Sequence, residues 1–188
     1  MSETLSWIFA ILFVLVVIAW YLTYTAARLD RLHVRLTGTL AALDAQLVRR
    51  AEASLELANS GLLDGATSLI LANAAAQSLE NPGEHGEIRE LVENDLTEAL
   101  QVSLTEPTCA AIRDVGPLGI DHLARLRSAC TRVELARRFH NDAVTDVRRV
   151  RRKWVVRIFR LAGHTPMPLT VEFDAAMPPG LAVPEPAS

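Results

Sequence analysis

Residues 7–20 read WIFAILFVLVVIAW and form the centre of a run of 24 uncharged residues, from Thr4 to Ala27. A bilayer core of about 30 Å needs about 20 apolar residues in a helix that rises 1.5 Å per residue, so this run can span it. Trp7 lies near one edge of the run and Trp20 near the other, where amphipathic rings prefer the membrane interface. The sequence therefore predicts a transmembrane helix within residues 1–27.

The competing interpretation of this run is a cleaved signal peptide. A signal peptide has a positively charged segment before an apolar core of about 7–15 residues. Here Glu3 is the one charged side chain before the run, and the run is longer than such a core, so an uncleaved signal anchor is favoured. Arginines 28, 31 and 35 follow the span and no Lys or Arg precedes it. The positive-inside rule then predicts a single-pass protein of the cell membrane, with the N-terminus outside and residues 28–188 in the cytoplasm.

The composition of the chain limits what the cytoplasmic part can be. Half of the 188 residues are hydrophobic, but only 5% are aromatic, which favours a helical core of Leu, Ala and Val. The net charge of −3 argues against a generally basic nucleic-acid-binding protein. Cys109 and Cys130 are too few for a disulfide scaffold, and in the cytoplasm we expect them to be reduced and packed.

Proline and glycine divide the rest of the chain into four predicted helices. Leucines from Leu29 to Leu47 recur at spacings of 3 and 4, which continues the membrane helix to a stop at Asn59-Ser60-Gly61. Further helices are predicted at 62–79, 87–104 and 118–161, with a loop at 105–117 and with Ile88, Leu91, Leu96 and Leu100 facing inwards in the third helix. We therefore expect an all-α, antiparallel four-helix bundle in residues 28–163, an extended docking segment at 164–176 and a disordered Pro-rich tail at 177–188.

Charge is segregated along the chain. Residues 52–114 carry 12 acidic and 2 basic side chains, whereas residues 121–160 carry 4 acidic and 12 basic ones. In an up-and-down bundle the end of the last helix, RRVRRKWVVRIFR, returns towards the inner leaflet, and a basic amphipathic helix is typical of contact with anionic lipid. A continuous helix would place its apolar side chains, Trp154 among them, on one face with Val147. The predicted lipid-facing surface comprises Arg149, Arg152, Lys153, Arg157, Arg160 and Trp154.

Two alternatives to this lipid-facing surface remain. One is a purely solvated basic face, which needs no partner. The other is nucleic-acid binding, which we do not expect because no known reading module or stacking platform accompanies the arginines.

Four short motifs follow one another along nearly the whole chain: Arg28–His33 (RLDRLH), Leu47–Glu52 (LVRRAE), Glu134–Val144 (ELARRFHNDAV) and the closing segment Pro168–Asp174. Together they resemble the motifs of the LemA family. They depart from the family pattern at Glu52 and His140, where the family has Asp and Tyr, which indicates a divergent branch. Because 18 of the 19 basic residues are Arg, we expect this branch to be of the high-GC, actinobacterial type. The resemblance implies a membrane-anchored antiparallel helical bundle without an established catalytic activity.

Helix geometry places two of these motifs at one height, roughly 30 Å from the membrane surface. Residues 134, 138 and 141 share a stripe at spacings of 4 and 3. We expect an interhelical polar network that either latches the helices in register or forms a ligand or partner site. In it, Arg49 or Arg50 pairs with Glu134, Arg138 pairs with Glu52, and Asn141 satisfies backbone or carboxylate groups. As a latch, it predicts that Glu134→Ala lowers the melting temperature.

No catalytic residue, cofactor or metal site is expected from the sequence. The five histidines lack metal-ligand spacing, the glycines form no phosphate-binding pattern, and no serine lies in a G-x-S-x-G context. The leading hypothesis is a non-enzymatic, membrane-anchored scaffold or adaptor that binds an unknown protein partner. The alternative is an anionic-lipid-binding or membrane-organising protein that acts through the basic end of its last helix. An enzyme or small-ligand receptor at the level of Arg49 and Arg138 is the third.

Overall fold

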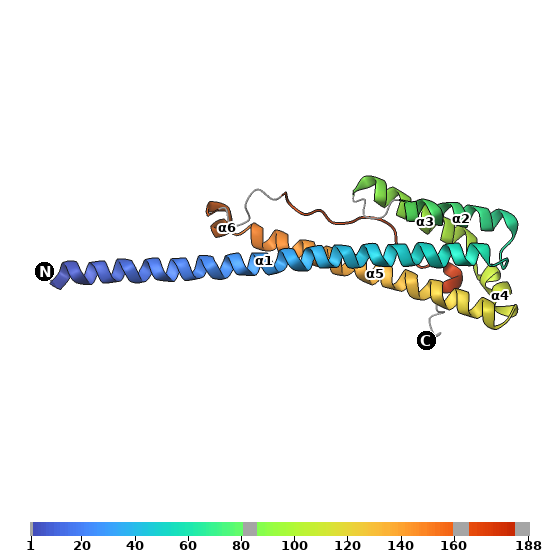
Figure 1. Cartoon of the computed structure of the whole chain (residues 1–188), viewed down its shortest axis with the longest axis horizontal. Helices are drawn as coiled ribbons and strands as arrows, with labels where there is room; N and C mark the ends of the chain where they lie inside the picture. Colours follow the sequence, from blue (N-terminus) through green and yellow to red (C-terminus); the bar gives the residue numbers. More distant parts are fainter. Residues whose placement is uncertain (1, 81–85, 160–165, 183–188) are drawn as a thin grey trace, which may run out of the picture. The chain divides into compact units, whose positions relative to one another are not determined.

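The computed structural model describes residues 2–80, 86–159 and 166–182, and over these residues the protein is all-α (Figure 1). The prediction of an all-α helical bundle with a long apolar N-terminal helix is therefore confirmed. Its helices are α1 (Ser2–Asn59), α2 (Gly65–Glu80), α3 (Glu87–Ser103), α4 (Glu106–Asp114), α5 (Pro117–Arg151), α6 (Trp154–Ile158) and the 3-10 helix η1 (Pro179–Leu181).

The chain divides into two compact units, and both α1 and α5 contribute to each. The anchor unit consists of Met1–Gly38 and Asp142–Leu169. The bundle unit consists of Thr39–Asn141 and Thr170–Ser188. Each unit has a buried apolar cluster of its own, so each is described separately.

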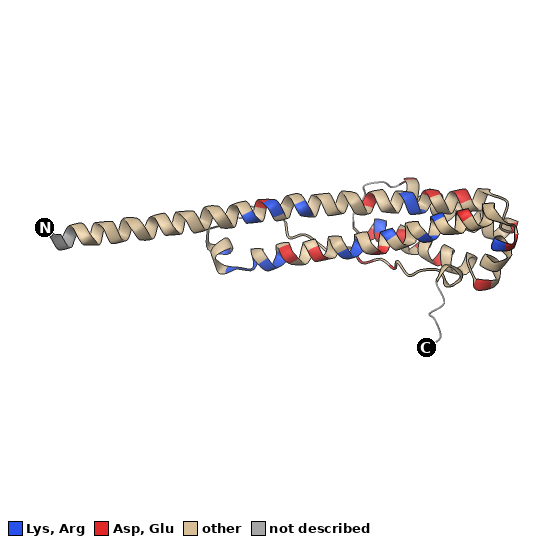
Figure 2. Cartoon of the chain, turned by 90° about the horizontal axis from the view of Figure 1, so that it is seen from below, with Lys and Arg blue, Asp and Glu red and all other residues tan. Residues whose placement is uncertain are grey.

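The N-terminal part of α1 is the apolar helix that the sequence predicts. Among the described residues, α1 alone is long and apolar enough to cross a membrane. Its large apolar side chains are exposed rather than packed; Phe13, for example, is 68% exposed. Figure 2 shows this part of the helix free of charged side chains after its first residues. A helix that is apolar all round and lacks protein cover is suited to a lipid environment.

The cluster of the anchor unit lies directly after the apolar run. Leu29 packs with Val150 and Val156, all three of them buried, and Leu32 covers the cluster in part. Two arginines at the end of α5 also hold the returning chain by its backbone. Arg148 Nε donates to the carbonyl of Pro168 at 2.9 Å, and Arg151 donates to the carbonyl of Pro166 at 2.8 Å.

In the bundle unit, α1 and α5 run antiparallel, and α2 and α3 pack against each other (Figure 1). The core is rich in Leu and Ala, as the composition predicts. Its large, fully buried side chains include Leu57, Leu71, Leu96, Leu104 and Leu126. Cys109 and Cys130 are free thiols packed inside this core, which confirms that they are packed rather than paired. Burial raises the pKa of both thiols, so they stay protonated near neutral pH.

The first helix boundaries follow their local signals. α1 ends at Asn59, and Gly61 then adopts φ 76°, a conformation that glycine accommodates without strain. α2 begins after Asp64, whose Oδ1 accepts hydrogen bonds from the backbone N–H groups of Ala66 and Thr67, both at 3.1 Å. Hydrogen bonds from Thr67, and then from Ala66, lower the pKa of Asp64 and keep this N-cap charged.

The loop predicted for residues 105–117 is wrong, because α4 lies there. Thr105 caps this helix by accepting from the backbone N–H of Thr108 at 3.4 Å. Pro107 lies in the first turn, where the N–H that proline lacks has no helical partner in any case. Proline thus marks the beginning of a helix here rather than a break.

The single helix predicted for residues 118–161 is also wrong. α5 ends at Arg151, and Lys153 is extended with ψ 133° before α6 begins. The predicted residues 160 and 161 lie outside the described part of the chain. The break redirects the side chains that follow it, which changes the predicted basic surface.

Residues at the C-terminal end pack further than predicted. The segment after Leu169 is extended, as expected, but the expected disorder from residue 177 onwards is wrong up to residue 182. Leu181 is buried in the core, and the backbone N–H of Gly180 donates to the carbonyl of Leu104 at 2.9 Å. Gly180 has to be glycine, because a Cβ there would lie 2.5 Å from Cys109 Sγ. Residues 183–188 lie outside the described residues.

Candidate functional site

The most highly charged buried site of the bundle unit is centred on Glu93 of α3. Its side chain is fully buried, and both of its carboxylate oxygens are occupied. Arg50 of α1 pairs with Oε2 at 2.5 Å, and Arg89 of α3 pairs with Oε1 at 2.8 Å. Ser78 of α2 donates its hydroxyl to Oε1 at 2.7 Å. One carboxylate thus joins three helices.

Further hydrogen bonds close this network. Arg50 also donates to the Thr97 hydroxyl at 3.1 Å, and Arg89 donates to the carbonyl of Ser78 at 2.8 Å. The Thr97 hydroxyl is within 2.8 Å of the Asp174 carbonyl, which ties in the C-terminal segment. The Arg50 guanidinium lies 5.9 Å from the centre of the Phe173 ring, a cation–π distance. We call Arg50, Ser78, Arg89, Glu93 and Thr97 the Glu93 network.

The chemistry of the Glu93 network is structural. A carboxylate whose two oxygens each accept charged hydrogen bonds, and which is sealed from solvent, is not placed to exchange a proton with a substrate. Two guanidinium groups share the single carboxylate, and Arg50 Nε is buried without a hydrogen-bond partner among the described residues. The arrangement therefore fixes helix register through paired charges inside the core.

Of the residues in the predicted network, only Arg50 belongs to the Glu93 network, and its predicted ion-pair partner is wrong. Arg50 does lie in a buried interhelical network, but it pairs with Glu93 rather than Glu134. Glu134 and Arg138 are exposed on α5, because the neighbouring Val133 occupies the buried face. The predicted pair of Arg138 with Glu52 does not occur either, since both side chains are solvent-exposed and no ion pair joins them.

Arg49 and Glu52 instead line an open hollow on the surface of the bundle unit. The hollow also contains Glu56, Arg125 and Arg132. Its charged side chains are exposed, and the Arg125–Glu56 distance is 3.7 Å, the length of a loose surface ion pair. Such pairs contribute about 0–1 kcal/mol, so this hollow supplies little stability.

Glu134→Ala should consequently leave the melting temperature nearly unchanged. The side chain is exposed and joins no ion pair among the described residues, so we expect a change in unfolding free energy within about 0.5 kcal/mol. Thermal unfolding of the full-length protein, followed by circular dichroism beside the parent chain, measures it. A melting temperature lower by several degrees would instead support the predicted structural network centred on Glu134.

Asn141 bonds backbone groups, but those of the C-terminal segment and not those of the predicted network. Its side-chain amide donates to the carbonyl of Val171 at 3.1 Å, and its oxygen accepts from the N–H of the same residue at 3.0 Å. Sequence reasoning missed Arg137, one turn earlier, which donates to the carbonyl of Phe173. Residues four apart lie on one helix face, and that spacing was the available signal. Arg137 and Asn141 thus supply the extended segment with backbone hydrogen bonds of the kind that a neighbouring strand supplies in a sheet.

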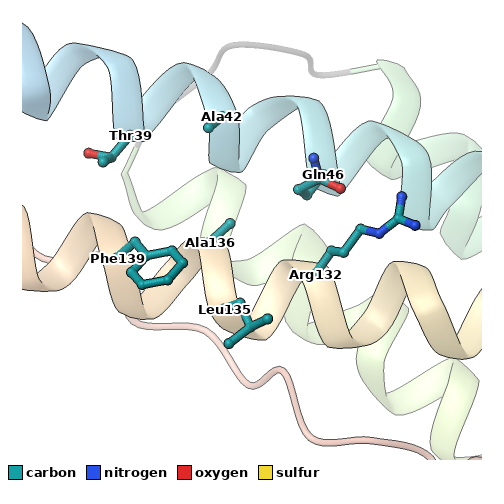
Figure 3. A pocket seen from close by; sticks show the side chains of 7 residues that line it. All are labelled: Thr39, Ala42, Gln46, Arg132, Leu135, Ala136 and Phe139. Atoms are coloured by element: carbon teal, nitrogen blue, oxygen red, sulfur yellow. The ribbon is translucent and has the colours of Figure 1, made fainter.

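An apolar groove lies between α1 and α5 in the bundle unit (Figure 3). Its volume is about 240 Å³. Phe139 is 58% exposed on one side of it, and Leu135 is also exposed. The Gln46 Oε1 atom is buried there without a hydrogen-bond partner among the described residues. The groove is lined by Thr39, Ala42, Gln46, Arg132, Leu135, Ala136 and Phe139.

The predicted lipid-facing residues in the anchor unit are solvent-exposed where they are described. Arg149, Arg152, Lys153, Arg157 and Trp154 all lie at the surface, and Arg160 lies outside the described residues. The prediction that Trp154 shares a face with Val147 is wrong, because the break before α6 turns Trp154 outwards. Val155 and Val156 take the buried positions instead.

Comparison of the chain with protein-family models, with curated proteins and with solved structures finds no match.

Proposed function

We propose that the chain is a single-pass membrane protein whose bundle unit is a cytoplasmic scaffold for a protein partner. The observation that carries this proposal is the exposed apolar part of α1, which continues without a break into a packed helical bundle. An apolar helix of this length exposed to water would be an aggregation hazard, whereas in a bilayer it is stable. The arginines that follow the run, and their absence before it, support the cytoplasmic side for the bundle.

The groove beside Phe139 supports a partner-binding role. It is bounded by two antiparallel helices, a shape into which the apolar side chains of a third helix fit. Arg132 at its edge joins no ion pair among the described residues, which favours an acidic side chain on the occupant. These features favour an amphipathic helix of a partner protein that carries an acidic residue beside its apolar face.

Cysteine accessibility in the full-length chain tests both parts of this proposal. Single cysteines at Ser2→Cys, Ala42→Cys and Ala66→Cys are treated with a membrane-impermeant maleimide in intact cells, in opened cells and after purification. Cys109 and Cys130 give little background because they are buried. We expect position 2 to react in intact cells and position 66 only in opened ones. Position 42, inside the groove, should react after purification but be protected in native membranes.

A matched variant makes the protection specific to the groove. Adding Phe139→Asp to Ala42→Cys should abolish the protection, because a carboxylate on the apolar wall opposes docking. Equal labelling of positions 42 and 66 in opened cells would contradict the partner site. Labelling of position 66 in intact cells would contradict the cytoplasmic location instead.

A further inference from the structure

We propose that α6 and the turn before it bind the anionic headgroups of the membrane that α1 crosses. This inference rests on the proposed membrane anchoring and names a second partner, lipid, for a different part of the chain. The first observation concerns the position of α6 along α1. Val156 of α6 packs against Leu29, which lies two residues beyond the end of the uncharged run at Ala27. Within the anchor unit, α6 is therefore fixed at the height where α1 leaves the bilayer.

The second step is what α6 exposes. Trp154 is 70% exposed and Ile158 is 66% exposed, and Phe159 beside them is also exposed. Three large apolar side chains within six residues form an unusual group for a water-facing surface. Tryptophan is enriched at membrane interfaces because its ring is amphipathic. The exposed side of α6 thus has the composition of an interfacial anchor.

The third step is that the backbone break creates this exposure. In a continuous α5, Trp154 would follow Val147 by seven residues and Val150 by four, which is the buried stripe. Both valines are buried. Because Lys153 is extended, the helix restarts with Trp154 outside and the next two valines inside. Arg148 and Arg151 hold the chain on the far side of α6 by its backbone carbonyls, which keeps this arrangement in place.

The surface of the anchor unit near α6 is rich in basic side chains. Exposed basic side chains lie at the end of α5, in the turn before α6, on α6 itself and on either side of Leu29 in α1. Asp30 is the one acidic residue within residues 27–34 and 147–159, and the nearby Asp146 pairs with Arg35 at 3.4 Å. None of these basic side chains forms an ion pair within the described residues. A cationic collar around interfacial aromatics complements the negative surface of the inner leaflet. The collar comprises Arg28, Arg31, Arg149, Arg152, Lys153 and Arg157.

The test uses the full-length protein in liposomes, with Trp7→Phe and Trp20→Phe so that Trp154 is the one remaining tryptophan. Liposomes contain phosphatidylcholine and phosphatidylglycerol, with bromine on the acyl chains of one lipid or the other. Compared with a tryptophan exposed to water, we expect Trp154 to emit at shorter wavelength and to be quenched only weakly by aqueous acrylamide. Brominated phosphatidylglycerol should quench it more strongly than brominated phosphatidylcholine at the same mole fraction.

Two charge variants then test the collar. Arg152→Gln, Lys153→Gln and Arg157→Gln together should abolish the preference for the anionic lipid. The matched triple variant Arg125→Gln, Arg127→Gln and Arg138→Gln, on the exposed surface of the bundle unit, should retain it. Equal quenching by the two brominated lipids in the parent chain, or full access of acrylamide, overturns the inference.

Alkaline washing separates failure of this inference from failure of the anchoring. If the protein leaves pure phosphatidylcholine liposomes in alkaline carbonate, the transmembrane helix itself is refuted. If it stays and Trp154 remains open to acrylamide, only the contact of α6 with lipid is refuted.

Discussion

Glu93→Ala is expected to lower the free energy of unfolding of the bundle by about 3–5 kcal/mol, the usual cost of removing one partner from a buried ion pair. The substitution leaves the guanidinium groups of Arg50 and Arg89 buried at 2% and 4% exposure without their shared carboxylate. It also takes the acceptor from the Ser78 hydroxyl. These losses fall on the contacts that join α1, α2 and α3, so the effect is global rather than local.

The measurement uses the protein's own buried thiols in full-length chain held in detergent. Cys109 and Cys130 both lie in the bundle core, so their rate of modification at increasing urea reports opening of the bundle without interference from the membrane helix. Glu98→Ala is the matched control on the same helix, because Glu98 is exposed and joins no ion pair among the described residues. We expect the control to change stability by less than about 0.5 kcal/mol. Equal effects of the two substitutions would contradict a stabilising role for the network.

A triple substitution separates the two causes of the expected loss. Arg50→Met, Arg89→Met and Glu93→Leu remove the charges together and fill the space with apolar atoms. Replacement of whole buried ionic groups by apolar side chains is often neutral or stabilising. We therefore expect the triple variant to be more stable than Glu93→Ala alone. A triple variant as unstable as the single one would show that the lost contacts, not the uncompensated charges, set the effect.

The helices could largely be predicted from the sequence because their signals are local. The leucine repeat that begins at Leu29 and the stop at Asn59 depend only on neighbouring residues, and both are observed. α4 is hard to predict because nine residues give little periodicity, and because Pro107 indicates a break as readily as the first turn of a helix. The break at Lys153 has no proline or glycine to announce it. Beyond the break, Val156 packs against Leu29, a contact between residues far apart in the sequence that no local pattern indicates.

The candidate site is harder to predict, because hydrophobic periodicity assigns the wrong face of α3 to the core. In the third helix Ile88 and Leu91 were expected to face inwards, yet both are exposed. The buried stripe contains Arg89 and Glu93 in line with Leu96 and Leu100. Hydrophobic periodicity assumes that charged residues face water, so it misplaces a stripe whose charges pair inside the core. The alternating charges at positions 89 and 93, one helical turn apart, were the signal for such a pair.

Phe173→Ala is the second large effect that we expect, at about 3–5 kcal/mol for truncating a buried phenylalanine. The ring is 3% exposed and packs with Leu43, Leu47 and Val133, so truncation leaves a cavity between α1 and α5. It also removes the ring that faces two cations, at 5.9 Å from Arg50 and 5.6 Å from Arg137. The same ring thus supports both the apolar cluster and the Glu93 network.

Two substitutions divide this effect into its parts. Phe173→Leu keeps most of the buried apolar volume and loses the aromatic ring, so the remaining loss is an upper limit on the two cation–π contacts, each about 0.5–2 kcal/mol. Leu169→Ala is the control at the residue that precedes this segment, because Leu169 is 75% exposed and its truncation leaves no cavity. Thiol modification in urea gives the free energy of unfolding for all three variants.

Hydrogen exchange then shows whether the C-terminal segment detaches. Phe173 has the largest of the buried side chains between Val171, which Asn141 contacts, and the packed Leu181. The backbone N–H groups of this segment donate to side chains of α3 and α5. These are separate bonds and not a continuous ladder, so we expect them to open together once the ring that anchors the segment is lost. We therefore expect the amides of Val171 and Asp174 to lose protection in Phe173→Ala and to keep it in Leu169→Ala. If Phe173→Ala destabilises the bundle while both amides stay protected, the segment is held by its side-chain hydrogen bonds alone, and the ring serves only the core.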